Sequence, residues 1–260
     1  MKKTAPKVGV TPPRVIIGDC PIDCYTLEEL VQHFSEICDT TRQRCLVSGV
    51  NAAMYVEMED RPAYRDQILS MDLVTSDSFW LAACCRFFGL RRVRHVPIVM
   101  LSLRLLEVLA DRGGRVFLLG TKKERVERAA QNVSERFRGI QVVGVRDGYF
   151  GKEHEADLSA QIRESGADVV LVGISTPKRE DWMVRRGGEV GAPVVIGVGG
   201  LLDILAGSTK EGPAWLRNVG MMWLYRFLQE PRRMWKRYLV GNSRFAWKML
   251  KVGLTRKVKV

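Results

Sequence analysis

Short runs of valine, isoleucine and leucine recur along the body of the chain, and they constrain the fold more than any other feature. Each run ends in glycine or a polar residue and is followed by a segment with the spacing of a helix. Strands that are apolar on both faces and separated by helices form a parallel sheet covered on both sides. The pattern therefore predicts an α/β fold, a Rossmann-like, doubly wound parallel sheet. The expected strands are Cys45–Val47, Asp72–Thr75, Arg115–Leu119, Ala167–Gly173 and Pro193–Val198.

Ligands of such sheets bind beyond the carboxyl ends of the strands, so the residues just after each run are the candidates for a site. Glycine-rich ends that lead into helices could hold a phosphate on exposed amides, or the glycines could serve only tight turns. The chain has no Gly-x-Gly-x-x-Gly and no Walker loop, which argues against a standard dinucleotide or ATP site. The candidate ends are 49–51, 76–78, 120–121, 175–180 and 199–203.

Asp77 stands out among these residues because it follows a predicted strand and precedes the apolar pair Phe79 and Trp80. A carboxylate in a partly apolar cleft can act as a general base. The same position also suits the N-cap of a helix. Asp203 has similar alternatives, since it could cap a helix or form an ion pair.

The positive charge of the chain is concentrated in its last fifth. The formal net charge is +12, and residues 208–260 carry thirteen lysines and arginines against two acids. We therefore expect an α/β core at residues 1–207 and a basic helical extension at residues 208–260. The N-terminus lacks the apolar segment of a signal peptide, and no apolar stretch approaches the ~18–20 residues of a membrane span, which favours a cytoplasmic location.

Four of the six tryptophans lie in the basic extension, at positions 215, 223, 235 and 247. Helical spacing is expected at 213–229, after Pro231, and at 243–251 with Asn242 as a cap. Basic faces interleaved with tryptophan are typical of helices in a membrane interface, with Arg232, Arg233 and Arg237 as lipid or diphosphate contacts. Two alternatives are that the helices pack on the core with solvated charges, or that the patch binds nucleic acid. We favour the anionic membrane surface and expect no nucleic-acid partner.

The six cysteines form no Cys-x-x-Cys pair, and the chain has only three histidines. This composition argues against zinc and is typical of free thiols in a reducing compartment. We expect neither a metal nor another cofactor.

The segment from Gly220 to Asn242 closely resembles the C-terminal signature of the WecG/TagA/CpsF glycosyltransferases. Further matches lie at 115–120, 147–150, 172–182 and 196–207, so the resemblance covers nearly the whole chain from about Arg14. It implies transfer of a sugar, often N-acetylmannosamine, from a UDP-sugar to a polyprenyl-diphosphate-linked acceptor in surface polysaccharide assembly. The implied reaction inverts the anomeric carbon, needs no catalytic metal and takes place at the inner face of the cell membrane. A homo-oligomer is compatible with the resemblance.

The resemblance also implies roles for individual residues. Asp77 matches the family's proposed base, which would take the proton of the acceptor hydroxyl, and Asn51 would hold the sugar beside it. Arg226 matches an arginine that meets the leaving diphosphate. The positions expected to bind the nucleotide-sugar are Gly120, Tyr149, Arg179, Gly199, Gly200 and Asp203.

The sequence departs from the family pattern at four pocket positions. Gly49 stands where the family usually has Thr, Ser78 follows Asp77 in place of Gly, and Met100 replaces an acid. Arg179 replaces a Gln; it suits an acidic sugar or a diphosphate, or it could pair with an acid at 180 or 181. These departures bear on sugar specificity, and the alternative function is a catalytically impaired member that binds nucleotide-sugar or lipid-diphosphate as a scaffold.

Overall fold

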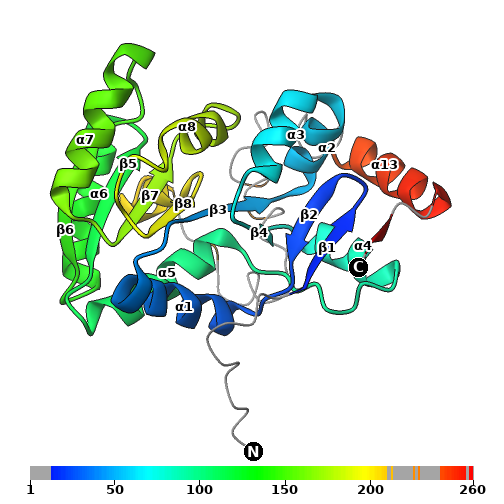
Figure 1. The fold of residues 1–260 in the computed structure, drawn as a ribbon, viewed down its shortest axis with the longest axis horizontal. Coiled ribbons are helices and arrows are strands. Elements are labelled where there is room, and N and C mark those ends of the chain that lie inside the picture. Colours follow the sequence, from blue (N-terminus) through cyan, green and yellow to red (C-terminus); the bar gives the residue numbers. More distant parts are fainter. Residues whose placement is uncertain are drawn as a thin grey trace, which may run out of the picture.

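A six-stranded parallel sheet forms the centre of the protein (Figure 1). This computed structural model describes residues 13–209, 212, 225, 228, 241–255 and 258–259. All neighbouring strands of the sheet run parallel, so their carboxyl ends meet at one edge. The spatial order is β4 (Leu73–Ser76), β3 (Cys45–Val50), β8 (Val194–Gly197), β7 (Val169–Gly173), β5 (Arg115–Gly120) and β6 (Gln141–Arg146).

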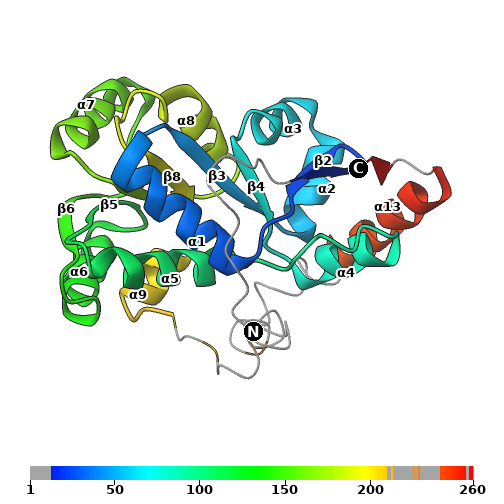
Figure 2. The same cartoon turned by 60° about the horizontal axis from the view of Figure 1, so that its bottom comes forward.

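Helices cover both faces of the sheet, as Figure 2 shows. Because side chains of a strand alternate between faces, each strand contributes to two separate apolar clusters, one on each side. One cluster includes α2 (Ala52–Asp60), α3 (Pro62–Leu69), α4 (Phe79–Phe87), α7 (Glu155–Ser165) and α8 (Lys178–Arg186). The other includes α1 (Leu27–Glu36), α5 (Ile98–Ala110), α6 (Lys123–Arg136) and α9 (Leu201–Leu205). The prediction of a doubly wound α/β fold is confirmed.

All five expected strands are present, but the sequence pattern missed β6. This strand lies at the edge of the sheet and is only half-buried along its length, so it lacks the continuous apolar run of the others. Two short helical turns, Ile37–Thr41 and Lys152–His154, were also not expected.

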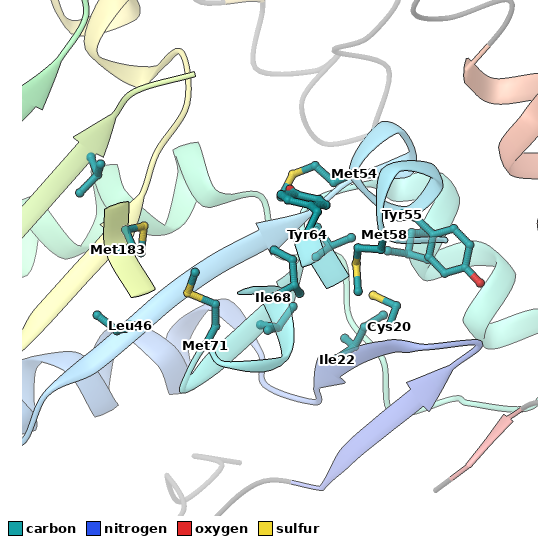
Figure 3. Close-up of a cluster of buried hydrophobic side chains, with 14 of the residues drawn as sticks. Cys20, Ile22, Leu46, Met54, Tyr55, Met58, Tyr64, Ile68, Met71 and Met183 are labelled. Carbon is teal, nitrogen blue, oxygen red and sulfur yellow. The ribbon is translucent and has the colours of Figure 1, made fainter. Parts of the chain in front are cut away.

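A small antiparallel sheet lies beside the main one. A hairpin of β1 (Arg14–Ile17) and β2 (Cys20–Asp23) pairs with β9 (Val258–Lys259) near the C-terminus. The carboxylate of Asp23 fixes the hairpin to the main sheet, because it accepts a bond of 2.7 Å from the Val74 amide and pairs with Arg14. Apolar side chains of α2, α3 and β2 fill the space between the two sheets (Figure 3).

The C-terminal helix α13 (Gly241–Thr255) packs against α2. The ring of Phe245 meets Tyr55 edge-on at 5.6 Å between centroids, and the Arg244 guanidinium lies 2.7 Å from the Asp60 carboxylate. This helix begins one residue before Asn242, so the expectation that Asn242 caps it is wrong. One face of α13 therefore packs on the core, while Trp247 on another face is 59% exposed. The other two helices expected in the extension lie outside the described residues, and the boundary at 207/208 stays a prediction.

Candidate active site

Asn51 and Asp77 lie side by side at the carboxyl edge of the sheet. They follow the neighbouring strands β3 and β4, and the Asp77 amide donates a bond of 3.0 Å to the Val50 carbonyl. The close packing of the two strand ends depends on Gly49, since a Cβ at that position would lie 2.9 Å from the Cβ of Asp77. The structure thus brings together the two residues that were expected to hold the sugar and take the proton.

The carboxylate of Asp77 holds the start of α5. Its Oδ1 accepts a bond of 2.8 Å from the amide of Ile98, the first residue of that helix. The N-cap of α4 is Ser78, not Asp77, because the Ser78 hydroxyl accepts from the Leu81 amide. The positive end of a helix favours the ionised form of a carboxylate. Asp77 is half-buried, so it combines a fixed position with contact to the open edge of the sheet.

Asn51 is the N-cap of α2. Its side-chain oxygen accepts from the amides of Ala53 and Met54, at 3.1 and 3.2 Å. This use of the oxygen fixes the orientation of the amide group. The Nδ2 of Asn51 has no hydrogen-bond partner among the described residues, so it can donate to a ligand beside Asp77.

His95 is a neighbour of Asp77 that the sequence analysis missed. Its ring is hydrogen-bonded to the Asp77 backbone and lies edge-on to Phe79, at 6.1 Å between centroids. Its backbone bridges to Ser76 at the end of β4. Burial lowers the pKa of His95 below its usual value, although the bond to Asp77 opposes this shift. The signal in the sequence was weak, because a single histidine eighteen residues after Asp77 gives no indication of contact.

His95 should make stability depend on pH. A histidine with a lowered pKa in the folded state takes up its proton at a lower pH than the unfolded chain does. The free energy of unfolding should therefore fall as the pH drops below about 6.5, and His95→Gln should remove part of that loss. Thermal unfolding of both proteins between pH 7 and pH 5.5 measures this difference. Exposed His154 is the matched control, because His154→Gln should keep the wild-type dependence. An equal loss in His95→Gln and wild type would contradict the assignment.

A second group of expected residues gathers at the ends of β5, β6 and β8. The Thr121 hydroxyl donates a bond of 2.6 Å to the Asp203 carboxylate, and Arg125 pairs with the same oxygen at 3.0 Å. The ion-pair alternative for Asp203 is therefore observed, and this pair ties α9 to the end of β5. Gly120 lies so close to β7 that a Cβ would fall 2.4 Å from the backbone of Gly173.

The glycine-rich end of β8 is open. Gly199 has a positive φ of 55°, and a Cβ on Gly200 would meet no atom within 4 Å. Tyr149, which follows β6, is 74% exposed and available to a ligand. Its amide is held by the Asp147 carboxylate at 2.9 Å.

Arg179 is buried and paired with its neighbour Glu180. Its Nε donates a bond of 2.8 Å to the Glu180 carboxylate, and its side chain lies against Gly197 and Gly199. The alternative that Arg179 pairs with an adjacent acid is therefore the one observed. The charge of a buried arginine is largely balanced by the carboxylate with which it pairs. Arg179 can therefore influence a ligand through its contact with the loop after β8 rather than through its charge.

The candidate residues are spread along the edge of the sheet. β4 and β6 are separated by five strand spacings of about 4.8 Å, or about 24 Å. Asp77 and Tyr149 must therefore contact different parts of any ligand. β8 lies directly beside β3, which places Gly199 and Gly200 nearest to Asn51.

Three of the positions that were expected to depart from the family pattern, Gly49, Ser78 and Met100, lie near Asp77 or at the start of the helices beside it. A Cβ on Gly49 would lie 2.2 Å from Cγ1 of Ile98, so the side chain of Ile98 fills the space that a Thr at position 49 would need. Ser78 caps α4, as described above, and Met100 lies half-buried in the first turn of α5. The side chain of Ile98 therefore forms an apolar wall beside Asp77.

Several expected residues cannot be placed. Arg226, Arg232, Arg233 and Arg237 lie outside the described residues. In the part of the chain that the structure describes, no three histidine, cysteine, aspartate or glutamate side chains gather as metal ligands would. Within the same residues, no helix is both long and apolar enough to cross a membrane. The six cysteines are free thiols.

A comparison with protein families matches nearly the whole chain. The model of the WecG/TagA/CpsF glycosyltransferase family covers residues 15–259. The matched region contains every candidate residue, from Asn51 to Arg237. The chain therefore belongs to the WecG/TagA/CpsF family of glycosyltransferases.

Proposed function

We propose that the protein is an inverting glycosyltransferase that moves a hexose-type sugar from UDP to a polyprenyl-diphosphate-linked acceptor. The observation that carries the proposal is the half-buried carboxylate of Asp77, fixed by the Ile98 amide beside Asn51. A positioned carboxylate is what a metal-independent transfer needs as its base. Membership of a glycosyltransferase family supports this reading of the site.

The proposed reaction is a single displacement. The acceptor hydroxyl attacks C1 of the sugar as its proton passes to Asp77. The bond from C1 to the diphosphate oxygen breaks, and UDP departs with the electron pair. Attack from the side opposite UDP inverts the anomeric carbon. The Nδ2 of Asn51 would donate to the sugar and hold C1 near the carboxylate.

The donor would lie along the edge of the sheet. Its sugar would face Asn51 and Asp77, and its diphosphate would meet the open loop at Gly199 and Gly200. Amides of a glycine-rich turn are good donors to phosphate. The nucleotide would extend toward Asp203 and Tyr149, and Arg179 would act by supporting the loop after β8.

The basic extension has two roles in the proposal. It would hold the enzyme on the cytoplasmic face of an anionic membrane, where the lipid-linked acceptor resides. Arg226 would approach the leaving diphosphate and stabilise its charge in place of a metal ion.

Arg226→Ala should lower kcat by about 10²–10³-fold, because one donor to a developing charge is lost. Transfer of labelled sugar to a short-chain lipid-diphosphate acceptor measures the effect. Arg244→Ala is the control, since Arg244 pairs with Asp60 on the surface and should leave kcat nearly unchanged. Equal rates in the two variants would contradict the role of Arg226.

The donor is best identified by thermal shift. A UDP-sugar that binds the folded protein raises the melting temperature, and the donor that gives the largest shift is then tested for transfer. The alternative is an impaired member that binds nucleotide-sugar or lipid-diphosphate as a scaffold, with an apolar wall of Ile98 beside Asp77 and Gly49. Binding without transfer to any acceptor would support that alternative over catalysis.

A further inference from the structure

The segment of residues 78–97 forms a lobe that leaves the sheet at Asp77 and returns beside it. We call it the α4 lobe, because α4 forms its first half. Ser76 and His95 bridge at its base, and Asp77 holds the first amide beyond it, that of Ile98. The lobe is therefore anchored at the candidate base, and its tip lies about one length of α4 away, or about 13 Å.

The α4 lobe is strongly basic, although the core as a whole is nearly neutral. Residues 78–97 contain no aspartate or glutamate. The lobe carries four arginines, all exposed: Arg86, Arg91, Arg92 and Arg94. None of them forms an ion pair with a carboxylate of the described residues. These four charges are therefore available to an anionic partner.

The tip of the lobe also exposes a large aromatic ring. Phe87 is 85% exposed, while its neighbour Phe88 packs onto α13, where a Cβ on Gly253 would lie 2.5 Å from the ring. Both views place α4 next to α13 (Figures 1 and 2). The face of α13 that points away from α2 is apolar and exposed, with Trp247, Leu250 and Leu254 at helical spacing. Lys251 lies over the Trp247 ring at 5.5 Å.

We infer that the α4 lobe and the outer face of α13 form one surface that rests on an anionic lipid bilayer. Guanidinium groups bind phosphates through paired hydrogen bonds, which suits lipid headgroups. Aromatic and leucine side chains beside cations are typical of protein surfaces that enter the headgroup region. The exposed arginines and the exposed apolar side chains occur together here, because the α4 lobe and α13 are in contact. The unpaired positive charge is complementary to an anionic leaflet.

This surface is separate from the arginines of residues 226–237. It joins the α4 lobe of the core to the outer face of α13 in the extension. The inference rests on the proposed function in one respect only, which is the role of the surface. A protein bound to the membrane through the α4 lobe would hold Asp77 at a fixed height above the headgroups. The diphosphate of a lipid-linked acceptor lies at that level. The lobe would thus orient the site as well as bind the membrane.

The test is flotation of the full chain with phosphatidylcholine vesicles, with and without phosphatidylglycerol. A variant with Arg91→Gln, Arg92→Gln and Arg94→Gln should bind anionic vesicles about 100-fold more weakly, since each interfacial arginine contributes about fivefold. Phe87→Ser should weaken the same binding about tenfold. All four side chains are exposed, so melting temperatures should stay near that of the wild type.

The matched control removes the same charge elsewhere. Arg128→Gln, Arg136→Gln and Arg138→Gln change exposed arginines on and beside α6, at the other end of the main sheet (Figure 1). This variant should float almost as well as the wild type. Equal losses in the two triple variants would overturn the inference, because net charge alone would then explain the binding. Wild type that binds duplex DNA but not anionic vesicles would also overturn it.

The outcomes separate this inference from the proposed function. Vesicle binding needs neither donor nor sugar acceptor, so a lobe-dependent loss without any transferase activity would reject only the proposed function. If the protein transfers sugar to a soluble acceptor, and the lobe and control variants bind vesicles equally well, only the proposed membrane surface would be rejected.

Discussion

Asp77→Asn should abolish transfer almost completely and leave the fold intact. Loss of a general base typically costs about 10²–10⁴-fold in rate. Asparagine keeps an oxygen that can accept from the Ile98 amide, so the start of α5 and the base of the α4 lobe should hold. Labelled-sugar transfer with a short-chain lipid-diphosphate acceptor measures the rate. Thermal unfolding measures the fold.

The control for Asp77 is binding of the donor. If the carboxylate acts on the acceptor proton, UDP should raise the melting temperature of Asp77→Asn as much as that of the wild type. Turnover that persists in the variant would remove Asp77 from the role of base. Loss of UDP binding together with turnover would assign Asp77 to donor binding.

Phe245→Ala should destabilise the protein by about 3–5 kcal/mol, the usual effect of removing a buried aromatic ring. Phe245 is 4% exposed and meets Tyr55 of α2, so its loss leaves a cavity between α2 and α13. The Trp247→Ala control, on the exposed face of the same helix, should change the free energy of unfolding by at most about 0.5 kcal/mol. Chemical denaturation measures both. Similar unfolding of the two variants would contradict the packing of α13.

This packing limits what a truncation can show. A chain that ends near Gly207 lacks Phe245, Met249 and Val252, which belong to the buried cluster around α2. A loss of membrane binding or transfer in such a chain would therefore not separate lost stability from a lost contact with lipid or substrate. Point variants such as Arg226→Ala and the lobe triple variant avoid this ambiguity.

The sequence predicted the parts of the fold that depend on local pattern. The five apolar runs became parallel strands, and the rule that their carboxyl ends meet brought Asn51 and Asp77 together. β6 was missed because an edge strand with a half-exposed face carries a weaker apolar signal. The strand pairing of β9 with β1 joins the two ends of the chain, and no local pattern indicates such a contact.

The site was predicted only in part, for a similar reason. Spacing suggested Asp77 as a cap for the helix that follows, whereas its carboxylate holds a helix that begins twenty-one residues later. Arg179 pairs with Glu180 because both side chains are buried in the core, and the sequence does not show this burial. The net charge of the core did not reveal the basic surface of the α4 lobe, because acids elsewhere in the core offset its four arginines.

If Asp77 takes the acceptor proton in a transfer from a UDP-sugar, its carboxylate must lie next to C1 of the bound donor. A crystal structure of the chain with a bound, unreactive UDP-sugar analogue measures this position. We expect C1 of the sugar to lie beside Asn51, with the Asp77 carboxylate on the side of C1 opposite the diphosphate. A sugar bound toward Tyr149 and away from Asp77, or a carboxylate on the same side as the diphosphate, would contradict it.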